Sequence, residues 1–208
     1  MSAPAQLSAA EARILGVLVE KAATVPDTYP LSLNALVTGC NQKTSRDPVM
    51  ELDEATVLAA LDTLRAHDLV IESSGGRVPR YAHNMGRVYQ LPTPAVALLT
   101  SLMLRGPQTV AELRASSERF YRFVDASSLE AYLEELAGRA AGALTVLLAR
   151  APGAREARWA HLLCGEPVVP AHAVAAPAPG GLAADVAALR EEVALLREEV
   201  ATLKAALG

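Results

Sequence analysis

The chain has 208 residues and a formal net charge of −4, with 19 basic against 23 acidic side chains. This balance excludes the overall basic excess of a dedicated nucleic-acid-binding protein, so any DNA-binding surface must be a local patch. Because 51% of the residues are apolar and only 4% are aromatic, the composition suits helices better than a β-sandwich.

Residues 7–91 carry the pattern of three helices followed by two strands. Ser8 and Glu11 match a capping box at the start of the first helix, and Asp53 is the predicted N-cap of the third. The predicted elements are, in chain order, a helix after Ser8, a strand at 29–31, a helix at 32–37, a helix from 53 to about 67, and strands at 69–71 and 81–83 around a glycine turn.

Residues 93–164 repeat this order. The predicted elements are a helix from 93 to about 105, a helix at 109–114, a helix at about 127–139, and strands at 144–148 and 158–163. A helix, a short helix, a longer helix and a two-stranded hairpin are typical of a winged helix-turn-helix domain. We therefore predict a mostly α fold with small β wings (α+β), built from two such domains in tandem at residues 1–92 and 93–165.

The segment between the second and third predicted helices, residues 41–48, is longer than the usual turn of about 3–4 residues. Lys43 and Arg46 are its cations, and its other side chains are mostly hydrogen-bonding groups. Such a segment is either a loop that braces the two helices through its own polar contacts or a loop that reaches a phosphate or a base edge.

Segments 29–36 (YPLSLNAL) and 40–49 (CNQKTSRDPV) resemble the YceH family of bacterial proteins, whose function is unknown. Further similar positions are 105–109, 112–114 and Trp159. The resemblance covers about residues 7–166 and implies two winged-helix domains. It implies no catalytic or ligand-binding residues.

The first domain gives two opposing signals about DNA. Acidic residues at 51, 53 and 54 stand where the third helix begins, and they repel phosphate. The wing, in contrast, carries Arg77, Arg80 and Arg87. With Lys43 and Arg46 these are the five predicted contacts to the DNA backbone, provided that loop and wing converge on one face. The alternative is that the wing arginines are simply solvated.

Three aromatic residues, Phe120, Tyr121 and Phe123, lie between the second and third helices of the second repeat. They either pack this loop onto the protein or form a partner-binding spot, because aromatic and arginine side chains are typical interface anchors.

Residues 166–181 are rich in Pro and Ala and predict an extended linker. Residues 182–208 follow a heptad with Val at position a and Leu at position d, which favours a parallel two-stranded coiled coil and hence a homodimer. The alternative is an amphipathic helix that folds back on its own chain. The predicted dimer seam is Val186, Leu189, Val193, Leu196, Val200 and Leu203.

We expect no enzyme, no metal and no cofactor, since the sequence has no phosphate-binding glycine loop, no triad order and no His/Cys metal spacing. Cys40 and Cys164 stand alone. The absence of a signal peptide and of a long apolar run leads us to expect a cytoplasmic protein with no membrane contact. We favour a dimeric DNA-associated or transcription-regulatory protein, and the alternative is a protein–protein interaction scaffold with acidic third helices.

Overall fold

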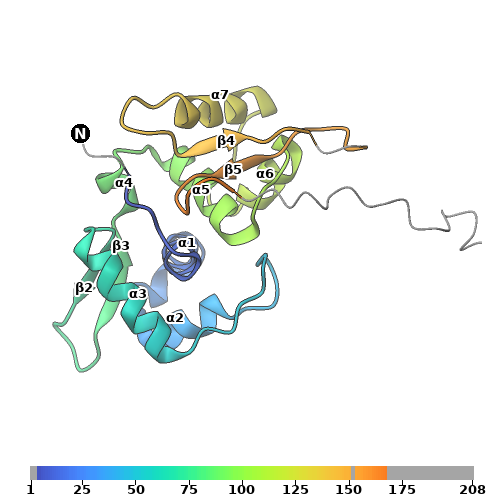
Figure 1. Cartoon of the computed structure of the whole chain (residues 1–208). Helices are drawn as coiled ribbons and strands as arrows, with labels where there is room; N and C mark the ends of the chain where they lie inside the picture. Colours follow the sequence, from blue (N-terminus) through green and yellow to red (C-terminus); the bar gives the residue numbers. More distant parts are fainter. Residues whose placement is uncertain (1–3, 151–152, 168–208) are drawn as a thin grey trace, which may run out of the picture. The chain divides into compact units, whose positions relative to one another are not determined.

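A computed structural model describes residues 4–150 and 153–167 (Figure 1). Its described part is a mixed arrangement of helices and small antiparallel sheets, as the α+β prediction requires. The elements are α1 (Ala9–Thr24), the 3-10 helix η1 (Pro26–Thr28), β1 (Leu31–Ser32), α2 (Leu33–Cys40), α3 (Glu54–Ala66), β2 (Val70–Ser73), β3 (Arg80–His83), α4 (Met85–Val88), α5 (Thr93–Arg105), α6 (Val110–Ser117), α7 (Ala126–Ala137), β4 (Thr145–Leu147) and β5 (Trp159–His161).

Polar side chains fix where the helices begin. The Ser8 hydroxyl accepts from the backbone N–H of Glu11, and the Glu11 carboxylate accepts from the backbone N–H of Ser8 at 2.7 Å. Asp53 caps α3 by accepting from the backbone N–H of Thr56 at 2.7 Å. Both predicted caps are confirmed. They supply partners to backbone donors that have none inside the helix.

The two halves of the sequence form separate small sheets. The first sheet has the order β1-β3-β2, with Leu31 opposite Tyr81, and all its pairs are antiparallel. The second consists of β4 paired antiparallel with β5. Gln108, just before α6, forms an isolated bridge with Trp159 in β5. Gln108 thus occupies the place in the second half that β1 occupies in the first.

The halves meet along α1 and α5, and the main hydrophobic core draws residues from both. A Cβ atom on Gly16 of α1 would lie 3.0 Å from Cδ2 of Leu104 on α5, so glycine permits this close approach. The chain before α1 also crosses to the second half, where the backbone N–H of Leu7 donates to the carbonyl of Leu163 at 2.7 Å. The two halves of the sequence therefore share the main hydrophobic core.

Three local features differ from expectation. Helix α2 extends to Cys40, beyond the predicted end at residue 37, and a Cβ on Gly39 would lie 2.7 Å from Cγ1 of Val17, so this glycine permits close packing of α2 on α1. On α3 the apolar Leu58 is 40% exposed, whereas the smaller Ala60 is buried. The short helix α4 was not predicted. None of the helices in the described part of the chain has the length and apolar character needed to cross a membrane.

Candidate interaction surfaces

The loop from 41 to 53, which joins α2 to α3 (the α2–α3 loop), is anchored by a buried ion pair. The Arg46 side chain is 0% exposed, and its guanidinium donates to both carboxylate oxygens of Glu20 on α1. It also donates to the carbonyl of Gly39 and to the side chain of Gln42. Arg119, from the loop after α6, pairs with the same Glu20 carboxylate. This corrects the expectation for Arg46, because a buried, paired guanidinium is not available to a DNA phosphate.

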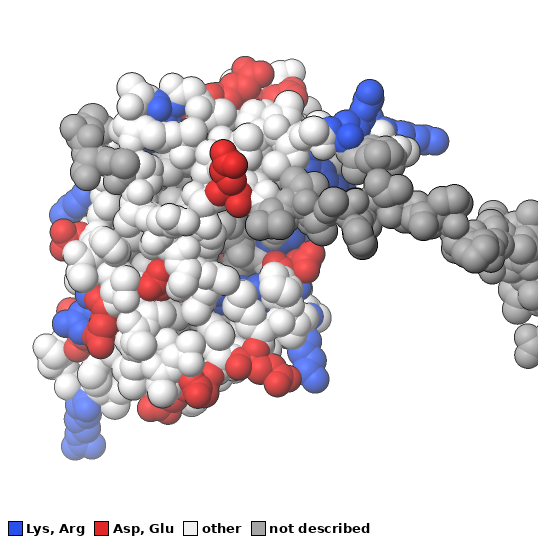
Figure 2. Space-filling model, in the orientation of Figure 1, with Lys and Arg blue, Asp and Glu red and all other residues white. Residues whose placement is uncertain are grey.

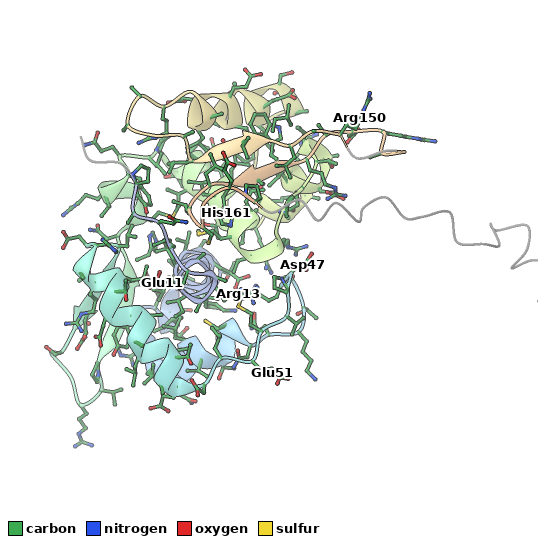
Figure 3. The ribbon with its side chains drawn as sticks, in the orientation of Figure 1. Glu11, Arg13, Asp47, Glu51, Arg150 and His161 are labelled. Atoms are coloured by element: carbon green, nitrogen blue, oxygen red, sulfur yellow. The ribbon has the colours of Figure 1, made fainter. Side chains whose placement is uncertain are left out.

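Further hydrogen bonds fix this loop to two buried helices. Arg13 on α1 donates to the carbonyl oxygens of Cys40 at 3.2 Å and Pro48 at 2.6 Å. The backbone N–H of Asp47 donates to the carbonyl of Leu104 on α5 at 2.8 Å. Figure 3 shows Arg13 on α1 and Asp47 in the loop that passes beside it. The loop therefore braces helices of both halves, which is the first of the two interpretations considered for it.

The remaining predicted backbone contacts come from two separate segments, the α2–α3 loop and the chain from the β2–β3 hairpin to α4. Lys43, Arg77, Arg80 and Arg87 are all exposed, and Arg80 donates to the carbonyl of Pro30 at 2.8 Å. In Figure 1 the α2–α3 loop lies to the right, the β2–β3 hairpin lies to the left, and α3 runs between them. The five contacts were predicted on the condition that loop and wing converge. In this view the two segments lie on opposite sides of α3, and the loop is bonded to α5 through Asp47.

Helix α3 exposes an acidic face. Figure 2 shows acidic side chains along the lower edge, where α3 begins in Figure 1. Arg65 is neutralised by Asp62 at 3.2 Å and by Glu72 of β2 at 3.0 Å. Leu58 stands exposed on the same helix. The exposed acids on or next to α3 are Glu51, Asp53, Glu54, Asp62 and Asp68.

The aromatic loop of the second half is mostly packed inward. Phe123 is 4% exposed and lies in the core of that half, with its ring edge-on to Tyr121 and Tyr132. Phe120 packs against the shared core, and the Arg119 guanidinium lies over its ring. Only Tyr121, at 36%, is substantially exposed. This corrects the partner-binding expectation for Phe120 and Phe123, because the core needs these two rings.

A family model described as "Protein of unknown function, DUF480" matches residues 7–154. A UPF0502 protein from Leptothrix cholodnii is 62% identical over 186 residues, which cover 88% of this chain and 83% of that protein. The chain belongs to this family. Other UPF0502 proteins, from Burkholderia orbicola and Burkholderia pseudomallei, are 63% and 61% identical over 161 residues, covering 77% of this chain and 68% of each relative. The resemblance to the YceH family, which is the same family, is confirmed.

The DUF480 match includes the α2–α3 loop and the β2–β3 hairpin and ends before the heptad segment. The predicted seam residues, Val186, Leu189, Val193, Leu196, Val200 and Leu203, also lie outside the described residues. Within residues 4–150 and 153–167, no three His, Cys, Asp or Glu side chains come together as a metal site would require. In the described part of the UPF0502 protein, the candidate functional surfaces are the acidic α3 face, the exposed arginines of the hairpins and the surface pockets.

Proposed function

We propose that this UPF0502 protein consists of two winged-helix domains, residues 1–92 and 93–165, that share one core. The support is the order helix, strand, helix, helix, strand, strand in the first half, together with the sheet order β1-β3-β2. The second half has the same order, with the Gln108–Trp159 bridge in place of the first strand. This fold alone does not select a partner, because winged helices bind both DNA and proteins.

We further propose that the first domain docks a protein partner through α3. One observation carries this proposal: Glu54, Leu58 and Asp62 follow one another at intervals of four residues, so they lie on one exposed helix face. An exposed leucine flanked by carboxylates suits a partner that offers an apolar pocket with a basic rim. The same carboxylates oppose the usual entry of this helix into a DNA groove. The partner is therefore a protein with a basic surface.

A photo-crosslinking amino acid placed at Leu58 in living bacteria tests this docking. We expect one protein to be captured at position 58 and to be lost when the E54K and D62K substitutions are added. The same amino acid at Leu147, an exposed leucine of β4, is the matched control. Capture that is equal at the two positions, or that survives the charge reversals, would contradict docking through α3.

DNA association is a second candidate, favoured by the arginines in and after the β2–β3 hairpin. Arg77, Arg80 and Arg87 are exposed, and none of the three forms an ion pair with a described residue. Three phosphate contacts predict a salt slope of about −3, which is less steep than the slope of about −4 to −5 that all five predicted contacts would give. Fluorescence anisotropy with a random DNA duplex at about 50 and about 200 mM salt tests this. Binding that weakens with salt and is lost in R77A/R80A/R87A supports it, and no binding at the lower salt leaves protein docking as the function.

The heptad segment carries a separate proposal, a parallel homodimer through residues 182–208. Its support is the sequence pattern of valine at a and leucine at d. Analytical ultracentrifugation of the full chain and of a chain ending at residue 181 tests it. We expect removal of the segment to halve the mass at micromolar concentration. An unchanged dimer would assign self-association to the winged-helix domains.

A further inference from the structure

A polar pocket of about 540 Å³ opens where the α2–α3 loop meets α5 and α6. Ser45 and Asp47 line it from the loop, Arg105 from the end of α5, Glu112 from α6 and Arg158 from the chain before β5. Pockets of this size are typical of small-molecule sites. Because its walls come from both halves, a ligand in this pocket would touch the loop and the second domain together.

Positive charge exceeds negative charge around this pocket. The groups that line it, or that belong to the ion-pair cluster of Arg46, include four guanidiniums and three carboxylates. Glu20 serves two of the guanidiniums, so one carboxylate is shared between them. The cations are the guanidiniums of Arg46, Arg105, Arg119 and Arg158 and the Lys21 ammonium, which lies 3.7 Å from the Glu20 carboxylate, and the anions are Glu20, Asp47 and Glu112.

Among these cations, Arg105 is the one that pairs with no carboxylate of the described residues. It is half-buried, and its Nη2 donates to the hydroxyl of Ser45 at 2.7 Å. Burial lowers the pKa of Arg105, and the nearby guanidiniums of Arg119 and Arg46 lower it further. An anion beside Arg105 would relieve this repulsion.

The Ser45 hydroxyl adds a second donor. Since its oxygen accepts from Arg105, its own hydrogen is left for another acceptor at the pocket wall. A guanidinium next to a hydroxyl is a common pair of donors for phosphate and carboxylate oxygens. Arg158 stands across the pocket, held by Glu112 in two hydrogen bonds of 2.7 and 2.9 Å.

We propose that this pocket binds a small organic dianion, either a phosphomonoester or a dicarboxylate, with one anionic group on Arg105 and Ser45. The second end of the ligand faces Arg158, where it competes with Glu112. This inference is independent of the protein or DNA partner of the first domain, because it rests on residues that neither of those surfaces includes.

Isothermal titration of the full chain at constant ionic strength tests the site with three probes: inorganic phosphate, adenosine 5′-monophosphate and succinate. We expect one organic probe to bind with one-to-one stoichiometry and more tightly than inorganic phosphate. Which of the two binds decides between a phosphomonoester and a dicarboxylate. R105Q should weaken that binding at least tenfold, and S45A should weaken it about threefold. R150Q, which changes an exposed arginine on the turn after β4 (Figure 3), should leave it unchanged.

Glu112→Gln separates ligand binding from a structural role. Glutamine still completes the capping box with Thr109, so α6 keeps its N-terminal cap. Removing the carboxylate frees Arg158 and deletes a negative charge, so binding of the organic probe should tighten several-fold. The proposal is overturned if neither organic probe binds at 5 mM, if R105Q binds as the wild type does, or if E112Q weakens binding. Circular dichroism melting of each variant establishes that it is folded.

Discussion

Replacing Glu20 by glutamine should cost more stability than any other single charge change in the described part of the chain. The Glu20 side chain is only 2% exposed and accepts hydrogen bonds from Arg46 and Arg119. Glutamine keeps the shape but removes the charge, which leaves the fully buried Arg46 guanidinium without a counter-ion. Breaking a buried pair in this way costs about 3–5 kcal/mol. Since Arg46 keeps its bonds to Gly39 and Gln42, we expect the lower end, about 3 kcal/mol.

Urea unfolding followed by far-ultraviolet circular dichroism measures this loss. With a denaturant slope of about 2 kcal/mol per molar, the unfolding midpoint should fall by about 1.5 M urea. The matched control is D62N, which breaks the exposed Asp62–Arg65 pair and should cost less than about 0.5 kcal/mol. E20Q/R46M should recover part of the loss, because it removes both charges. A loss below about 1 kcal/mol for E20Q, or no recovery in the double variant, would refute the argument that this pair fixes the loop.

Three further predictions concern packing, thiols and pH. G16V should destabilise the fold by about 1–3 kcal/mol, because its side chain would press on Leu104, whereas G75A has open space around it and should be near neutral in the same urea assay. With a thiol reagent at pH 8, the native chain should react slowly at the half-buried Cys164 and not at Cys40, whose pKa burial raises to about 12; C164S should then react only after unfolding. Burial lowers the pKa of His161 from 6.5 to about 4, so the unfolded chain binds a proton more readily below pH 6.5, and stability should fall by about 2 kcal/mol from pH 7 to pH 5. H161Q should lack this part of the pH dependence, and an equal loss in both proteins would contradict the assignment.

Most of the fold follows from local patterns in the sequence. Ser8, Asp53 and Thr109 each stand where a side-chain oxygen caps a helix, and each cap is present. The role of Gly39 could not be decided from the sequence alone. Glycine is typical of both helix ends and close helix contacts, and only the position of Val17 distinguishes the two.

The candidate surfaces were less predictable because burial of charge depends on tertiary contacts. Lys43 and Arg46 look equivalent in the sequence, yet one is exposed and the other is buried against Glu20. Glu20 has helical spacing from the apolar positions of α1, and this was the one signal in the sequence that a cation from another segment pairs with it. Phe123 and Tyr121 are likewise two aromatic residues of one loop. Only the structure shows that Phe123 packs on the apolar side of α7 and that Tyr121 stays exposed.

The position of the α2–α3 loop gives the shared core a functional consequence. Helix α1 is buried from Glu11 to Glu20 and α5 from Pro94 to Leu104, so each covers a face that either half alone would leave in water. The loop is bonded to both helices, and the pocket at Arg105 lies where it meets the second half. A dianion present at 100 times its Kd would stabilise this junction by about 2.7 kcal/mol. That is close to the contribution expected from the Glu20 carboxylate, so occupancy of the pocket would be large enough to change how firmly the two halves hold together.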